Sequence, residues 1–168
     1  MTNSWVEPPS RPALESALPS LLKQLKLAQF RSQWQAAEQQ ATADGWSPAS
    51  YLYVLAEQEH QQRHQARLRR LLHEAQLPVP KTLADYDWAA IPDLERPQIE
   101  QLAHDTGWVD RAENLLLFGP SGVGKTHLAA GICRSLIALD RSARFFSGTT
   151  LVQELQRAKA DYALAKAL

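Results

Sequence analysis

The sequence predicts an α/β protein in which a helical N-terminal domain precedes part of a parallel β-sheet domain. Residues 13–77 are rich in Leu, Ala and Gln, and their apolar positions recur at helical spacing. After Arg111 the pattern changes to an apolar run, a glycine-rich loop, a helix, a second apolar run and a last helix, which is typical of an α/β sheet domain. The expected organisation is a disordered tail over residues 1–12, a helical domain over 13–77, a connector over 78–110 and a sheet domain over 111–168.

Composition excludes several classes of protein. The 168 residues carry 18 Lys and Arg against 18 Asp and Glu, and 45% of them are hydrophobic, as in ordinary globular proteins. A single cysteine, Cys133, allows neither an internal disulfide nor a multi-thiolate metal site. No apolar run approaches the roughly 20 residues of a membrane-spanning helix, and residues 1–10 lack the apolar core of a signal peptide. We therefore expect a cytoplasmic protein without a membrane partner.

The N-terminal third begins with a tail and a long helix. Prolines cluster in residues 1–12 and oppose helix and sheet alike. Apolar residues at helical spacing predict an amphipathic helix over 13–41, either continuous or broken near Pro19. Asp44 and Gly45 are typical of a helix end.

A second helix and a connector follow. Ser47 before Pro48 is a favourable N-cap with a proline in the first turn, and the helix is expected to run to about Leu77, where prolines follow. Prolines also punctuate residues 78–110, for which we predict a connector with a short helix around 98–103.

The predicted sheet domain opens with a buried strand over residues 114–118. A helix is expected over 125–139 and a second short strand over 143–147. Thr150 and Gln153 are spaced as a capping box at the start of a last amphipathic helix.

Residues 119–126 match the P-loop pattern at every required position, between the first expected strand and the next helix. Glycines let the backbone curl so that consecutive N–H groups point at phosphate oxygens, and the helix N-terminus adds partial positive charge. Lys125 could reach the β and γ oxygens, and the Thr126 hydroxyl could bind magnesium. The predicted ligands are ATP and Mg²⁺, with Thr126 at the metal, and the predicted binding residues are Gly119, Pro120, Ser121, Gly122, Val123, Gly124, Lys125 and Thr126.

Hydrolysis needs a further acidic residue at the end of another strand. Asp140 follows four apolar residues, but these continue the helix that begins at Lys125, so we do not assign it this role. Asp161 falls in the last predicted helix. The residues after Thr126 suffice for a helix, a strand and a helix, whereas a complete sheet has about five strands. We expect a chain truncated within its nucleotide-binding domain that binds ATP without hydrolysing it.

An arginine-rich stretch lies between residues 60 and 73, with no acidic residue inside it. Such a helix face binds DNA phosphates or an acidic partner in some proteins and is merely solvated in others. Acidic residues flank it on both sides, so the sequence leaves both interpretations open. The arginines are Arg63, Arg67, Arg69 and Arg70.

Several stretches together resemble a known family. They are residues 21–30, Leu55 to Glu59 with the arginine-rich helix, a lysine-threonine-leucine run at Lys81 with the aromatic residues Tyr86 and Trp88, and residues 114–129. This pattern resembles the IstB-like ATP-binding proteins, AAA+ helper ATPases of insertion-sequence transposition that are similar to DnaC-type helicase loaders.

The resemblance implies an AAA+ domain, ATP binding and hydrolysis coupled to oligomerisation on DNA, and a transposase as partner. It also implies that Tyr86 and Trp88 lie near the nucleotide base, although packing between domains would explain them equally well. The family's Walker B acids, sensor residue and arginine finger have no counterpart up to Leu168.

Two other functions compete with this interpretation. A helicase-loader or replication adaptor would use the helical domain to bind a partner protein. A small-molecule kinase also carries a P-loop, but such kinases usually begin with it, whereas here about 110 mostly helical residues precede it.

Overall fold

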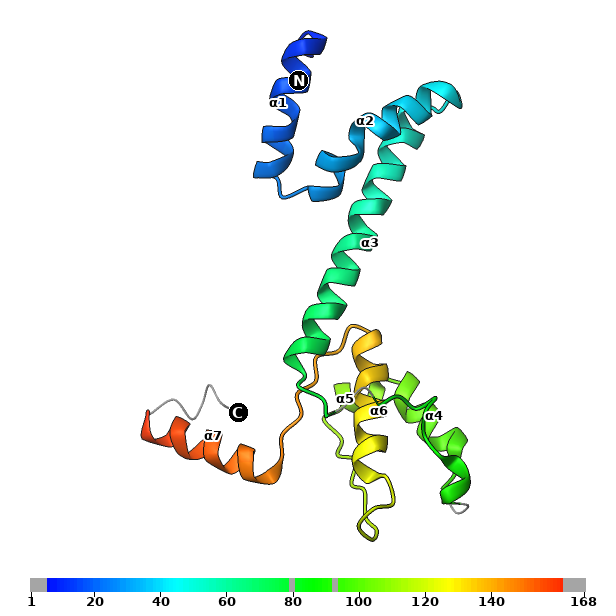
Figure 1. The fold of residues 1–168 in the computed structure, drawn as a ribbon, viewed down its shortest axis with the longest axis vertical. Helices are drawn as coiled ribbons and strands as arrows, with labels where there is room; N and C mark the ends of the chain where they lie inside the picture. Colours follow the sequence, from blue (N-terminus) through cyan, green and yellow to red (C-terminus); the bar gives the residue numbers. More distant parts are fainter. Residues whose placement is uncertain (1–5, 79–80, 92–93, 162–168) are drawn as a thin grey trace. The chain divides into compact units, whose positions relative to one another are not determined.

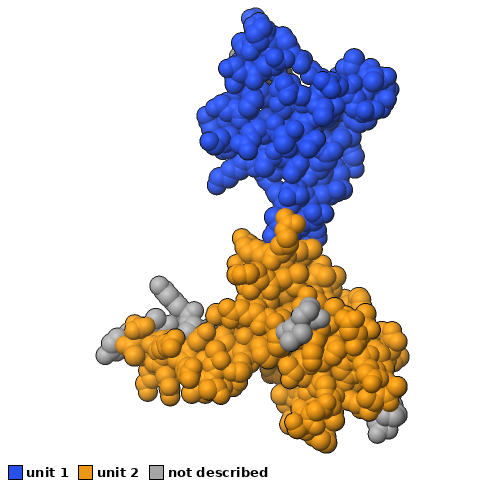
Figure 2. Space-filling model, in the orientation of Figure 1, with its two compact units in different colours: residues 1–66 blue, residues 67–168 orange. Residues whose placement is uncertain are grey.

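The computed structural model describes residues 6–78, 81–91 and 94–161, and within these ranges every regular element is a helix (Figure 1). The chain divides into two compact units, Met1–Ala66 (unit 1) and Arg67–Leu168 (unit 2) (Figure 2). The boundary between the units falls inside the helix α3 (Pro48–Glu74). The predicted tail lies partly outside the described residues. The elements are α1 (Arg11–Gln24), α2 (Ala28–Ala43), α3 (Pro48–Glu74), the 3-10 helix η1 (Trp88–Ala90), α4 (Arg96–His104), α5 (Gly107–Asp110), α6 (Lys125–Ala138) and α7 (Gly148–Ala160).

The predicted parallel β-sheet is wrong, because no described residue is in a strand. Residues 113–120 and 141–147, which contain the two expected strands, have no regular secondary structure. A strand exists only through the ladder of hydrogen bonds that it shares with a neighbouring strand. Here the Phe145 N–H donates instead to the carbonyl of Ala75, just past the end of α3, at 2.8 Å.

The apolar run before the glycine loop is used for side-chain packing. Leu115 and Leu117 pack against the core of unit 2. Leu116 and Phe118, which alternate with them, are 70% and 87% exposed. The alternation that predicted a strand is therefore present as one packed and one exposed face, without backbone pairing.

In unit 1, two helices replace the single one expected over residues 13–41. The chain turns at Lys26, which has a φ of 56°, and Pro19 lies inside α1 rather than at the break. The N-cap expected at Ser47 is confirmed, since its Oγ accepts a hydrogen bond from the Ser50 N–H at 3.1 Å.

In unit 2, α4 and α6 lie where the sequence predicted helices. The last helix begins earlier than expected. Its N-cap is Ser147, whose Oγ accepts a hydrogen bond from the Thr150 N–H at 3.1 Å. Thr150 therefore belongs to the first turn of α7 and is not the cap residue.

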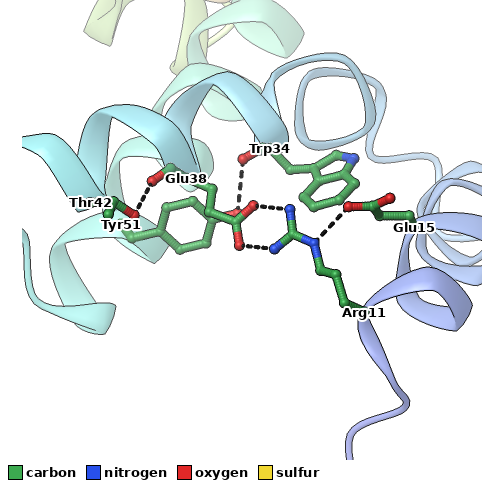
Figure 3. Close-up of polar contacts among 6 residues, drawn as sticks. All are labelled: Arg11, Glu15, Trp34, Glu38, Thr42 and Tyr51. Carbon is green, nitrogen blue, oxygen red and sulfur yellow. Dashed lines mark hydrogen bonds and ion pairs between the residues drawn. The ribbon is translucent and has the colours of Figure 1, made fainter.

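A charged cluster fastens α1 to α2 around Trp34 (Figure 3). The Arg11 guanidinium donates to both carboxylate oxygens of Glu38, at 2.6 and 2.8 Å, and its Nε donates to Glu15 at 2.6 Å. These bonds to Arg11 lower the pKa of Glu38. The guanidinium also lies 5.8 Å from the centroid of the Trp34 ring, and the Tyr51 hydroxyl donates to the Trp34 carbonyl at 3.2 Å.

Glu59 is a buried carboxylate that joins α3 to the start of α2. It accepts hydrogen bonds from the Gln29 N–H and from Arg63 Nε, both at 2.8 Å. Arg63 also donates to the Lys26 carbonyl at 2.7 Å. The first arginine of the basic stretch therefore helps to fix the turn between α1 and α2.

The core of unit 2 forms where α4 packs against α6. Its buried residues are Tyr86, Ile99, Ala103, Leu128, Ile132 and Leu136. On α6, burial also raises the pKa of the Cys133 thiol.

None of the helices in the described ranges is long and apolar enough to cross a membrane. Within the same ranges, His, Cys, Asp and Glu form no group that could hold a metal ion.

Candidate nucleotide-binding site

The glycine loop adopts a backbone conformation that residues other than glycine rarely adopt. Gly122 and Gly124 have φ values of 87° and 83°, in the left-handed region. Gly124 is also the N-cap of α6, and its carbonyl accepts a hydrogen bond from the Leu128 N–H at 2.9 Å. The loop therefore turns directly into the helix.

The first turn of α6 supplies donors and positive charge. The first N–H groups of an α-helix have no acceptor within the helix, and they carry partial positive charge. Lys125, the first helical residue, bends back over the loop, and its Nζ donates to the Gly119 carbonyl at 2.9 Å and to the Pro120 carbonyl. The next residue, Thr126, is exposed. A lysine ammonium, a hydroxyl and free amides thus lie at one helix end, a donor set that fits a polyphosphate with its metal ion.

Tyr86 packs against this loop. Its hydroxyl donates to the Val123 carbonyl at 3.2 Å, and its side chain is buried. A Cβ built on Gly124 would lie 3.0 Å from Tyr86 Cε2 and 3.2 Å from the hydroxyl oxygen. The sequence left Tyr86 open between a place near the base and packing between domains, and the structure places it against the loop backbone within unit 2.

The segment before Tyr86 is joined to α6. The ring nitrogen Nε2 of His127 is hydrogen-bonded to the Thr82 carbonyl at 2.8 Å. Leu83 fits so closely on Gly131 that a Cβ there would lie 2.7 Å from Leu83 Cδ2. The sequence alone did not predict the contact between His127 and the Thr82 carbonyl. One signal in the sequence pointed to this contact. Thr82 lies in the lysine-threonine-leucine run and His127 directly follows the P-loop, and both runs belong to the pattern that resembles the family.

A pocket of about 320 Å³ adjoins the loop. Apart from Lys125 and the hydroxyl of Tyr86, its lining is apolar or backbone. It is bounded by Tyr86, Ile91, Leu94, Leu116, Leu117, Phe118, Gly119, Pro120, Val123, Lys125 and Leu128.

The acidic residues weighed for hydrolysis lie at helix ends. Asp140 lies just beyond the C-terminus of α6, whose 14 residues span about 21 Å from the glycine loop. There it pairs with Arg67, whose Nε lies 3.0 Å from Asp140 Oδ1. Asp161 is the C-cap residue of α7. Asp140 thus lies at the far end of α6 from the glycine loop, as the residue count predicted.

The basic stretch of α3 is largely paired with acids. Arg63 pairs with Glu59, and Arg67 pairs with Asp140. Arg70 has its Nε 3.7 Å from Glu74 Oε1. Arg69 is exposed and makes no ion pair within the described ranges. These arginines remain more than half exposed, so their pairs are of the weak surface kind.

Comparison with known proteins gives a consistent result. Residues 20–168 match the family model described as IstB-like ATP binding protein. The chain is 37% identical over 154 residues to a protein of Sinorhizobium fredii named as an insertion-sequence ATP-binding protein, and covers 52% of it. It is 32% identical over 144 residues to the protein named for IS5376 of Geobacillus stearothermophilus, and 31% identical over 148 residues to the one named for IS21 of Pseudomonas aeruginosa.

These alignments cover 92%, 86% and 88% of the chain. The chain spans about half the length of these curated relatives, namely 52%, 57% and 56%. All three are named for insertion sequences, so the helicase-loader alternative is not favoured. The family predicted from the sequence is confirmed, and the chain belongs to the IstB-like ATP-binding proteins.

Proposed function

We propose that this chain binds ATP together with Mg²⁺ through residues 119–126, as part of a helper ATPase of DNA transposition. The observation that carries the proposal is the glycine loop that turns into α6 with Lys125 folded over it. The family is one of ATP-binding proteins, which supports the choice of nucleotide.

In this proposal the loop amides and the first N–H groups of α6 bind the phosphates. Lys125 would exchange its two carbonyl partners for the β and γ oxygens, a charge-assisted contact that is stronger than a neutral one. The exposed Thr126 hydroxyl would bind Mg²⁺.

The wider role is argued from the relatives. Their names place them in insertion sequences, and we propose that the whole protein works with a transposase on DNA, as an oligomer in the cytoplasm. ATP binding to residues 119–126 of this chain would then make the action of the whole protein on DNA depend on the nucleotide.

Replacing Lys125 by alanine tests the nucleotide site. The change removes a charge-assisted contact of about 1.5–3 kcal/mol, so affinity for MgATP should fall about 10-fold to 100-fold by titration calorimetry. Lys23→Ala removes an exposed lysine from the last turn of α1 in unit 1 and should bind like the wild type. Equal affinity of the Lys125→Ala variant and the wild type would contradict the proposal.

We propose that the arginine-rich stretch of α3 contributes to DNA binding by the whole protein, and this predicts a change in the salt dependence of that binding. Arg69 is the arginine to neutralise, because it has no ion pair in the described ranges whose loss would disturb the fold. Arg69→Gln should lower the slope of log affinity against log salt for duplex DNA by about 0.9. Arg31→Gln makes the same charge change at an exposed position of α2 and should leave the slope unchanged. An unaltered slope in Arg69→Gln would show that Arg69 makes no phosphate contact and would leave it to protein contacts or to solvent.

A further inference from the structure

We propose that Tyr86 is a positioning residue of the glycine loop, which holds the left-handed turn at Gly124 and thereby aims the first N–H groups of α6. The inference rests on the proposed function for its effect on nucleotide affinity. Tyr86 itself would not touch the nucleotide and would act through the backbone of Val123 and Gly124.

Two independent contacts tie Tyr86 to this turn. The hydroxyl donates to the Val123 carbonyl at 3.2 Å, which fixes the orientation of the peptide unit that enters Gly124. The ring fills the space beside Gly124, since a Cβ there would meet Cε2 at 3.0 Å. The φ of 83° at Gly124 is thus supported by a ring on one side and a hydrogen bond on the other.

The Tyr86 ring is itself held in place by two other rings. The Trp88 ring lies edge-on with a centroid distance of 4.8 Å, and the His127 ring does so at 5.2 Å. The Arg96 guanidinium lies 5.4 Å from the Trp88 ring centroid. Such edge-to-face packing favours one orientation of each ring.

The turn that carries Tyr86 is anchored to α6. The Tyr86 N–H donates to the Leu83 carbonyl at 3.3 Å, and Thr82 Oγ1 is hydrogen-bonded to Asp85 Oδ2 at 2.6 Å. Because a carbonyl only accepts, His127 Nε2 donates to the Thr82 carbonyl. The segment from Thr82 to Tyr86 is thus fixed to the start of α6 as well as to the glycine loop. A shift of this segment would therefore move both the start of α6 and the loop.

Tyr86→Phe removes only the hydroxyl and keeps the ring. We expect MgATP affinity to fall about two- to tenfold, the effect of one hydrogen bond. We also expect faster amide hydrogen exchange over residues 121–126 without nucleotide. The matched control is Tyr51→Phe, which removes a phenol bond of the same 3.2 Å length to the Trp34 carbonyl in unit 1. It should leave both readouts at wild-type values.

Hydrogen exchange separates this inference from the proposed function. A wild type that binds no MgATP would contradict the proposed function, while faster exchange in Tyr86→Phe would still support the positioning role. Wild-type exchange and affinity in Tyr86→Phe would overturn it. Trp88→Leu is a second variant that releases the Tyr86 ring without altering its hydroxyl, and it should speed exchange over the same residues. Unchanged exchange there would equally count against the inference.

Discussion

Replacing Gly124 by valine is expected to lower MgATP affinity about 30-fold or more. A β-branched residue at a φ of 83° costs on the order of 1–3 kcal/mol, and overpacking adds about 1–3 kcal/mol. The overpacking arises because the new Cβ would meet Tyr86 Cε2 at 3.0 Å. The turn can relieve both costs only by giving up the conformation that aims the α6 amides. The smallest sum of these two costs, about 2 kcal/mol, corresponds to a loss of about 30-fold.

Two glycines separate the causes of this effect. Gly45→Val imposes similar backbone strain at a φ of 66° in unit 1, where a Cβ meets nothing within 4 Å. It should lower the thermal stability of unit 1 and leave affinity unchanged. Gly122→Val has a φ of 87° and equally open space, so it measures strain within the loop without the Tyr86 clash. Calorimetry that gave Gly124→Val the affinity of the wild type would show that this turn does not position the phosphate donors.

Features that depend on near neighbours in sequence could be predicted from the sequence. The N-cap at Ser47 is a contact between residues three apart, and α6 follows from an apolar pattern within its own residues. The left-handed glycines of the loop follow from the spacing of the P-loop pattern. The position of Asp140 beyond α6 follows from counting residues along one helix.

Features that depend on distant partners could not be predicted. The apolar alternation of residues 114–118 specifies which side chains are packed, but a strand also needs a neighbour for its backbone, and none pairs with it in the described ranges. Tyr86 and Val123 are 37 residues apart, and Arg11 and Glu38 are 27 apart. No periodicity of the sequence encodes such pairs.

The arginine-rich stretch shows the same limit. The run without acidic residues left a basic face and a solvated helix both open, and in the structure Arg63 pairs with Glu59, one turn away, while Arg67 pairs with Asp140, far along the chain. Glu59 lies one turn before Arg63 and is buried by α2. The flanking Glu59 could be seen in the sequence, whereas the pairing of Arg67 with Asp140 depends on the fold.

Trp34→Ala is expected to destabilise unit 1 by about 3–5 kcal/mol, the usual cost of removing a buried tryptophan side chain. Trp34 is 5% exposed and packs with Leu22 and Leu55, so the change would leave a cavity between α1, α2 and α3. It would also remove the ring beneath the Arg11 guanidinium. The hydrogen bond from Tyr51 to the Trp34 carbonyl would remain available, because it uses the backbone.

The effect should be confined to one unit, since the core that contains Trp34 is made of residues of unit 1. Hydrogen exchange should speed up over α1 and α2 and stay at wild-type values over α6, and MgATP affinity should be retained. Trp46→Ala, at a half-buried tryptophan of the same unit, should cost clearly less. Loss of protection over α6 in Trp34→Ala would show that the two units unfold together. Retained protection together with retained affinity would show that the nucleotide site needs no support from unit 1.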